Sequence, residues 1–184
     1  MYTKVTLKDR IRVPPNMFSE KLEKSIEEVI KQEYEGSLAK NAGVLIMLNN
    51  VKEIGEGIII PEDGAVYYET TFEMIAWEPR VHEVVEGAVS EVREFGVFVR
   101  MGPIDGLVHT SQVMDDFVNY GKGGLVGKQS SKAIKLGDAV RARIIAVSLK
   151  SKEGAKIGLT MRQPGMGKLE WIEKEFEEKK EGKK

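Results

Sequence analysis

The first thirteen residues alternate between apolar and polar side chains. The apolar positions are Val5, Leu7, Ile11 and Val13, and mostly lysine, threonine and arginine stand between them. A period of two residues is typical of a strand that buries one face. The basic residues of the other face either contact nucleic acid or an acidic partner, or form a solvated edge that resists aggregation. We favour the solvated edge.

A helical pattern follows this strand. Apolar residues recur at intervals of mostly three and four positions, which predicts an amphipathic helix that ends near Gly36 and packs on a sheet. The residues of the stripe are Phe18, Leu22, Ile26, Val29 and Ile30.

Three apolar strands are predicted after the helix, over residues 44–48, 58–60 and 65–77. Gly55 and Gly57 predict a turn between the first two. Pro61–Gly64 predicts a turn before the third, because proline presets one dihedral and glycine accepts a positive φ. A strand, a helix and three further strands predict an α+β domain over residues 1–80.

The second half of the chain predicts an all-β barrel over residues 82–164. Short segments alternate between apolar and polar positions, and Gly87 and Gly96 interrupt the first of them. Small closed barrels need bends of this kind. With Val97 and Val99 facing the core, Phe98 must face outward, because side chains alternate across a strand.

The outward residues of this barrel predict a surface for single-stranded nucleic acid. A bulge at Gly96 would bring Phe95 to the side of Phe98, and His109 ends a neighbouring strand. Aromatic rings beside cations form a surface on which unpaired bases stack. The cations that we assign to it are Arg100, Arg141, Arg143, Lys156 and Arg162. The alternatives are that both phenylalanines belong to the core and that the cations are solvated.

Two segments have no obvious use in a lone barrel. Residues 114–132 form an insertion with four glycines, which predicts a loop. Residues 168–180 place Leu169, Ile172 and Phe176 on one stripe, which predicts a C-terminal helix. Such apolar surfaces often mark a partner site. The simpler alternative is that the helix covers its own barrel.

The distribution of charge along the chain narrows the class of ligand that each half can bind. Residues 1–81 carry 10 Lys and Arg against 14 Asp and Glu, a net −4, whereas residues 82–167 carry 12 against 9, a net +3. The positive segment is the one with the aromatic residues, which favours binding of single strands there. A whole-chain charge of −1 argues against bulk binding of duplex DNA.

Candidate chemistry is sparse. The chain has no cysteine and two histidines, so thiol catalysis and disulfides are excluded and a reducing, cytoplasmic setting is expected. The longest apolar run, residues 44–48, is too short to cross a bilayer. Asp115 and Asp116 lack a metal-ligand pattern, and Gly121–Gly124 lacks the P-loop spacing. We expect no cofactor, no metal and no catalytic residue.

The barrel resembles a known RNA-binding fold. The residues Phe95-Gly96-Val97-Phe98-Val99, followed by Gly106-Leu107-Val108-His109 and Ser111, look like the motif of the OB fold named after ribosomal protein S-one.

The whole chain also resembles a family. This is the larger stalk protein of archaeal RNA polymerase, designated E-prime, which is related to the seventh subunit of eukaryotic RNA polymerase II. The resemblance covers residues 1–172. The segments that carry it are Ile11–Pro15, Asp63–Ala65, Met114–Asp116, Val140–Ile144, Leu159–Pro164 and Gly167–Ile172. The chain departs from the family at Gly165-Met166, where an aromatic residue and a leucine are frequent.

The family resemblance implies two domains without an active site. A tip domain of truncated ribonucleoprotein-like fold docks on the polymerase core, and we place its contacts around Gly36–Gly43 and Pro61–Gly64. The OB-fold barrel faces emerging single-stranded RNA. A smaller stalk protein, designated F in that family, completes a stalk heterodimer that assists initiation and elongation. For the partner surface we select Trp77, Asp115, Phe117, Leu169, Ile172 and Phe176.

Two other functions remain open at this point. A free translation or RNA-decay factor would use the barrel alone and leave residues 1–80 unexplained. A nuclease would need a carboxylate cluster that the sequence does not display.

Overall fold

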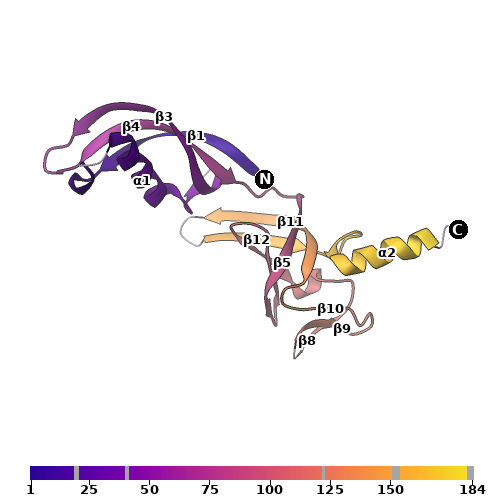
Figure 1. Cartoon of the computed structure of the whole chain (residues 1–184). Coiled ribbons are helices and arrows are strands. Elements are labelled where there is room, and N and C mark those ends of the chain that lie inside the picture. Colours follow the sequence, from indigo (N-terminus) through magenta and orange to yellow (C-terminus); the bar gives the residue numbers. More distant parts are fainter. Residues whose placement is uncertain (19–20, 40–41, 122, 151–153, 182–184) are drawn as a thin grey trace. The chain divides into compact units, whose positions relative to one another are not determined.

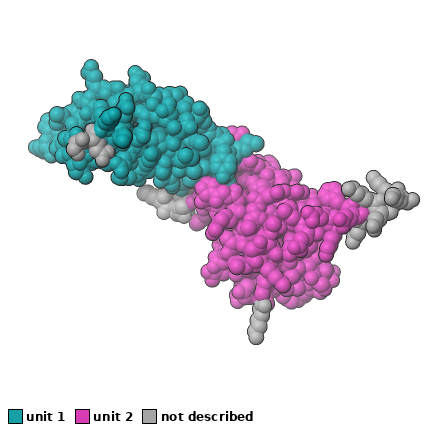
Figure 2. All heavy atoms as spheres, in the orientation of Figure 1, with its two compact units in different colours: residues 1–78 teal, residues 79–184 magenta. Residues whose placement is uncertain are grey.

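The computed structural model describes residues 1–18, 21–39, 42–121, 123–150 and 154–181. The chain divides into two compact units, residues 1–78 and residues 79–184 (Figures 1 and 2). Each unit has its own sheet and its own core. The predicted class, an α+β unit followed by an OB-like barrel and a C-terminal helix, is confirmed.

Unit 1 is a four-stranded antiparallel sheet with one helix against one face (Figure 1). The strand order is β1-β4-β3-β2, so the first strand of the chain pairs with the last strand of the unit. Its elements are β1 (Tyr2–Val13), η1 (Pro15–Met17), α1 (Leu22–Tyr34), β2 (Leu38–Ala39), β3 (Gly43–Ile59) and β4 (Val66–Trp77).

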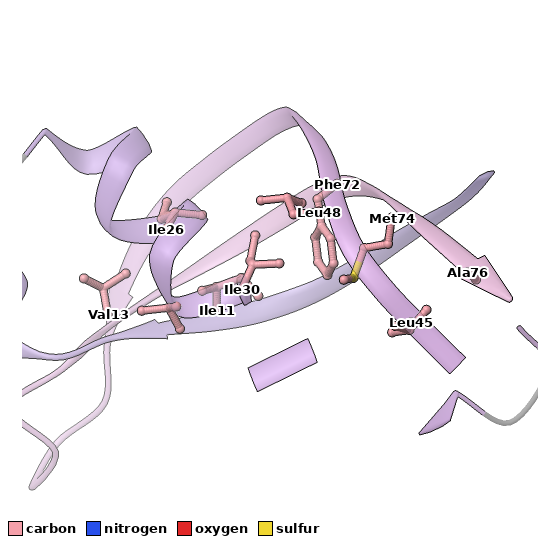
Figure 3. Packing of buried hydrophobic residues seen from close by; sticks show 10 residues of the cluster. Ile11, Val13, Ile26, Ile30, Leu45, Leu48, Phe72, Met74 and Ala76 are labelled. Atoms are coloured by element: carbon pink, nitrogen blue, oxygen red, sulfur yellow. The ribbon is translucent and has the colours of Figure 1, made fainter. Parts of the chain in front are cut away.

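The core of unit 1 lies between α1 and the sheet (Figure 3). Phe72 and Met74 of β4 and Ile26 and Ile30 of α1 are all fully buried in it. The ring of Phe72 meets the ring of Tyr34 edge-on, with 5.1 Å between centroids. Burial of each such large side chain contributes about 1.5–3 kcal/mol. Packing of the apolar face therefore holds a helix of this length on the sheet.

The helix is shorter than its apolar stripe predicted. α1 begins at Leu22, and Lys21 before it is extended. Phe18 therefore lies outside the helical repeat, and it is 50% exposed. Leu22, the first helical residue, is 41% exposed.

The predicted turn at Gly55 and Gly57 is wrong. β3 runs through both glycines and stays paired with β4, with an irregular register between Ile54 and Gly57. A Cβ atom on Gly57 would lie 2.8 Å from the side chains of Tyr68 and Val66. Gly57 thus allows a close approach within a bent strand.

The turn from β3 to β4 is organised by one carboxylate. Asp63 accepts hydrogen bonds from Nε and Nη2 of Arg12 at 3.0 and 2.8 Å, from the hydroxyl of Tyr67 at 2.6 Å and from the N–H of Ala65 at 3.2 Å. The bonds from Arg12 and Tyr67 hold the pKa of Asp63 well below its usual range. A turn was predicted here, but the positive φ falls on Glu62, at 76°, and Gly64 is not among the residues with positive φ.

The face of the sheet opposite α1 is charged. Lys8 of β1 forms an ion pair with Glu69 of β4. Lys4 and Lys52 both pair with Glu73, at 3.4 and 2.8 Å. Hydrogen bonds from these lysines lower the pKa of both glutamates. The basic row of β1 is therefore matched by acidic side chains across the strands.

Unit 2 is a closed barrel with a small additional sheet. The barrel order is β7-β6-β5-β11-β12, and the parallel pair β7–β12 closes the ring. Its elements are β5 (Val84–Arg93), β6 (Gly96–Arg100), β7 (Asp105–His109), η2 (Thr110–Gln112), β8 (Val118–Gly121), β9 (Gly124–Gly127), β10 (Ala133–Ile134), β11 (Ala139–Lys150), β12 (Gly154–Thr160), β13 (Gly167–Lys168) and α2 (Leu169–Glu181).

Glycine lets the barrel strands approach closely. A Cβ atom on Gly96 would lie 2.2 Å from the carbonyl oxygen of Val108, and one on Gly87 would lie 2.2 Å from the carbonyl oxygen of Arg100. Real Cβ atoms do not come this near to backbone. The register slips near Ser90 in β5, between Val89 and Glu91, and no register shift interrupts the pairing of Gly96.

The insertion is structured, so the predicted loop is wrong in part. β8 and β9 form an antiparallel hairpin, and β9 also pairs with β10. Leu125 and Ile134 are fully buried and anchor this sheet. Asp116 accepts from the N–H groups of Phe117, Gln129 and Ser130, and these bonds lower its pKa. This acidic residue therefore holds the insertion together.

Candidate nucleic-acid interface

An open groove of about 570 Å³ runs across strands β6, β7, β12 and β11 of unit 2. Phe98, Leu107 and His109 line it from β6 and β7. Gln112 of η2 and Lys156 of β12 lie on it as well. The lining is mostly apolar, so the groove offers a hydrophobic floor with a few polar groups.

The strand register explains the floor. Phe98 lies opposite Leu107, Leu107 lies beside Gly158 of β12, and Gly158 lies opposite Ala146 of β11. Paired residues point to the same face of a sheet. One large ring and one leucine thus stand next to two small residues, which leaves the hollow. The core prediction for Val97 and Val99 is confirmed, since they are 0% and 1% exposed.

Phe95 and Phe98 lie together as the sequence predicted, but the predicted bulge at Gly96 is wrong, because Gly96 is paired in register on both sides. Their ring centroids are 6.1 Å apart and their planes are at 89°, an edge-to-face contact. Phe95 is 50% exposed, and Phe98 is half-buried. Phe95 lies in the tight turn between β5 and β6. Phe95 therefore lies outside the barrel core, and Phe98 is not among the buried residues of that core.

His109 and Gln112 stand at the polar edge of the groove, and each is tied to a neighbour. Nδ1 of His109 accepts from the N–H of Ser111 at 3.3 Å and lies 3.0 Å from its hydroxyl. Oε1 of Gln112 accepts from the hydroxyl of Thr160 at 2.8 Å. Gln112 was not predicted from the sequence, because only the fold brings it beside Thr160 of β12.

The predicted cations do not form a single surface. Lys156 lines the groove. Arg100 is exposed at the end of β6 and faces Asp105 at 3.5 Å. Arg141 pairs with Glu86 at 2.8 Å. Neither arginine is among the described residues of the groove lining. For Arg141 the strand register explains this absence, because Arg141 lies opposite β5 and β13, on another side of the barrel.

Arg143 and Arg162 also lie outside the groove lining. Arg143 stands between Val84 and Thr160 in the barrel. Its Nε is the one buried side-chain polar atom without a hydrogen-bond partner in the part of the chain that the structure describes. Arg162 bonds Asp115 through Nε at 2.8 Å. It lines a second hollow of about 450 Å³ with Asp115 and residues of the insertion.

The residues selected for a partner surface differ in exposure. Phe117 and Phe176 are 75% and 57% exposed. Ile172 is 5% exposed and Trp77 is 4% exposed, so neither presents its side chain at the surface. Leu169 is half-buried. The C-terminal helix therefore covers its own unit with Ile172 and leaves Phe176 outside.

Lys132 joins the insertion to α2. Its Nζ lies 5.3 Å from the ring centroid of Trp171 and 3.2 Å from a carboxylate oxygen of Glu175. Cation–π contacts and ion pairs at exposed sites each contribute at most about 1 kcal/mol. Together they place the exposed Phe117 and Phe176 in segments that contact one another.

The residues that the structure describes contain no cluster of three His, Asp or Glu side chains suited to a metal ion. Their helices are too short or too polar to cross a membrane.

A closed five-stranded barrel of this strand order, with Phe95 and Phe98 beside an apolar groove, belongs to the OB-fold class. The family described as "S1 RNA binding domain" matches residues 78–161. The family described as "SHS2 domain found in N terminus of Rpb7p/Rpc25p/MJ0397" matches residues 8–64. The chain thus carries the SHS2 domain first and the S1 domain after it.

Similar proteins of nearly the same length define the family. The chain is 44% identical to DNA-directed RNA polymerase subunit Rpo7 of Sulfolobus acidocaldarius over 178 residues, which cover 96% of this chain and 97% of that protein. It is 44% identical to the same subunit of Saccharolobus solfataricus, over 94% and 97% of the two chains. It is 27% identical to DNA-directed RNA polymerase III subunit RPC8 of Bos taurus, over 59% and 53%. The chain belongs to the family of DNA-directed RNA polymerase subunit Rpo7, which confirms the predicted resemblance.

Proposed function

We propose that this chain is a subunit of an archaeal DNA-directed RNA polymerase and that the subunit has no active site of its own. Unit 2 binds emerging single-stranded RNA, unit 1 docks on the polymerase core, and the smaller stalk protein completes the stalk heterodimer. In this role the chain assists initiation and elongation and works in the cytoplasm. Family membership supports the assignment, and the groove beside Phe95 and Phe98 carries the RNA-binding part.

Stacking accounts for RNA affinity on a surface with so few cations. Each base that stacks on an aromatic side chain contributes about 1–3 kcal/mol, whichever of the four bases it is. Phe98 forms one wall of the groove and Phe95 supports it edge-on. Lys156 adds a charge for the sugar-phosphate backbone. The proposed mode is therefore stacking first and electrostatic attraction second.

Replacing Phe98 by alanine tests the RNA-binding proposal. Loss of one stacking contact should weaken binding of a labelled single-stranded RNA by about ten-fold. Phe18→Ala is the matched control, because it removes a 50% exposed phenylalanine from unit 1. Circular dichroism checks that both variants fold. Equal affinity for Phe98→Ala, Phe18→Ala and the wild type would remove the groove from the RNA path.

The exposed apolar side chains of unit 1 support core docking at one end of its sheet. Ile58 and Ile59, at the end of β3, are 55% and 70% exposed, and Ile60 is 43% exposed. A hollow of about 300 Å³ beside Phe18 lies between η1, α1 and the sheet. Exposed apolar patches often mark partner sites. We infer that this end, with the Pro61–Gly64 turn, meets the core.

The two docking loops expected from the sequence lie at opposite ends of the sheet. Pro61–Gly64 joins β3 to the start of β4, whereas Gly43 lies beside Trp77 at the end of β4. Residues 40 and 41 of the first loop lie outside the described residues. Three consecutive exposed apolar side chains, Ile58, Ile59 and Ile60, lie beside the second loop, so we assign the core contact to that loop.

For the smaller stalk protein we infer a surface around Phe117 and Phe176. Both rings are exposed, and the Lys132 contacts hold their segments together. Hydrogen exchange with and without the smaller stalk protein gives the test. Amides of the insertion and of α2 should gain protection in the pair, while those of Ile11–Val13 in unit 1 serve as an internal reference. Protection confined to unit 1 would refute this surface.

A further inference from the structure

Two polar side chains of the groove are fixed by neighbours that do not line it. His109 and Gln112 are held by Ser111 and Thr160 respectively. In each pair the hydrogen bond occupies one polar atom of the groove residue, and so it determines which polar atom of that residue is left for the groove. This determines whether the groove offers donors or acceptors to a ligand.

The bond to Ser111 fixes the tautomer of His109. A backbone N–H can only donate, so Nδ1 of His109 must accept at 3.3 Å and carries no proton. The hydroxyl of Ser111, 3.0 Å away, donates to the same nitrogen. The proton of the neutral ring is therefore on Nε2. His109 lines the groove, so its remaining polar group is an N–H donor.

The bond from Thr160 fixes the amide of Gln112. Thr160 is 3% exposed, and its hydroxyl oxygen already accepts from the N–H of Arg162 at 3.3 Å. A buried hydroxyl also needs an acceptor for its proton, and Oε1 of Gln112 lies 2.8 Å away. The amide NH₂ of Gln112 must then point away from Thr160. Because Gln112 lines the groove, this NH₂ is a second donor there.

We propose that His109 and Gln112 form a donor edge that recognises acceptor oxygens of single-stranded RNA, and that Ser111 and Thr160 are the positioning residues that set it. The inference rests on the proposed RNA-binding function. Lys156 lines the same groove and also only donates, whereas the carboxylate of Asp105, which lines it too, already accepts from the hydroxyl of Ser90 and faces Arg100. The acceptors are oxygens of the phosphates or carbonyl oxygens of the bases.

Gln112→Glu tests the donor edge. Glutamate keeps the size of glutamine and an acceptor for Thr160, but it replaces the donor with a charged acceptor. Binding of a labelled oligouridylate should weaken about ten-fold. Gln163→Glu is the matched control, because it adds the same charge at an exposed position outside the groove lining. Thr160→Val keeps the shape, frees the amide to rotate, and should weaken binding about three-fold.

Oligoadenylate distinguishes the two sources of oxygen, because adenine has no carbonyl. Equal losses on both oligonucleotides assign the donors to phosphates, and a loss confined to oligouridylate assigns them to bases. Equal losses for Gln112→Glu and Gln163→Glu would overturn the donor edge. Phe98→Ala separates this failure from that of RNA binding itself, since it must still weaken binding when only the donor edge is wrong.

A measurement on the wild-type chain covers variants that fail to fold. The chain has two histidines, His82 and His109, so nitrogen NMR of the imidazoles is readily assigned. Nδ1 of His109 should appear unprotonated, and the side-chain NH₂ signal of Gln112 should shift when oligouridylate is added. A protonated Nδ1 in the neutral ring, or an unmoved amide signal, would overturn the proposal.

Discussion

The outer sheet face of unit 1 and the grooved face of unit 2 are both β-surfaces, but their chemistry differs. In unit 1, lysines of β1 and β3 meet glutamates of β4 in ion pairs. In unit 2, Phe98 and Leu107 stand beside small residues, with Lys156 at the margin. The lysines of the unit 1 face are thus neutralised by glutamates of the same face. The apolar face of unit 2 is the one with a groove that can accept a ligand. Charge counted along the sequence therefore points to unit 2, but it does not locate the groove within that unit.

The largest expected effect comes from removing one phenylalanine from each unit, because one loss should lower the free energy of unfolding and the other should lower RNA affinity. Phe72→Ala empties a fully buried site in unit 1 and should cost about 3–5 kcal/mol of unfolding free energy. Phe98→Ala removes a half-buried ring from the groove and should affect RNA affinity more than stability. Chemical denaturation with a separate probe in each unit measures both. A large loss of stability in unit 2 from Phe98→Ala would show that its ring belongs to the core.

A charge placed among the apolar residues at the end of β3 should interfere with core docking. Ile59→Glu puts a carboxylate beside the Pro61–Gly64 turn, and incorporation into polymerase should fall at least about ten-fold, because the charge must lose its hydration in the interface. Met47→Glu is the control at the other end of the same strand, where Met47 is 49% exposed. Reconstitution with tagged core and immunoblotting gives the ratio. The reverse pattern would move the contact to the Gly43 end.

The ion pairs of unit 1 can be tested by pH. The folded-state pKa of Asp63 lies below its ordinary value of 3.8, so its bonds stabilise the fold at pH values above that value. This stabilisation should disappear as pH falls below 3.8 toward the folded-state value. Asp63→Asn cannot ionise, so the stability difference from wild type should be largest near neutral pH and shrink in acid. Melting curves at several pH values measure it, and a constant difference would contradict the role given to Arg12 and Asp63.

The smallest expected effect concerns salt. One phosphate contact to a single strand changes the slope of log affinity against log salt by about 0.7. Lys156→Gln should make the slope shallower by about this amount. Lys8→Gln removes the same charge from the ion-paired face of unit 1 and should leave the slope unchanged. Titrations at three salt concentrations distinguish the two variants, and equal slopes would mean that the groove lysine does not touch RNA.

Sequence patterns predicted the fold class because alternation and helical spacing report burial directly. Val97 and Val99 are buried and Phe98 faces outward, as their period requires. Glycine was ambiguous, since Gly57 lies in a bent strand although a turn was predicted there. The hairpin within the insertion escaped notice because its strands are four residues long and glycine-rich.

The candidate site was predicted only where its residues are near in sequence. Phe95, Phe98 and His109 come from one continuous stretch, and the structure brings Phe98 and His109 to one groove. The orientation of Arg141 depends on the strand beside it and that of Arg162 on its bond to Asp115, and the sequence alone revealed neither. Gln112 became visible only through its bond to Thr160, 48 positions away.

The parallel pairing of β7 with β12 has a consequence for the order of events during synthesis. It joins Gly106 to Ile157 and Leu107 to Gly158, so the groove floor does not exist until the ribosome has released most of unit 2. Unit 1 ends at residue 78, and N-terminal domains generally fold first as a chain emerges. Pairings between residues far apart in sequence also form slowly. The nascent chain should therefore acquire its helix-covered sheet well before it can hold an RNA strand.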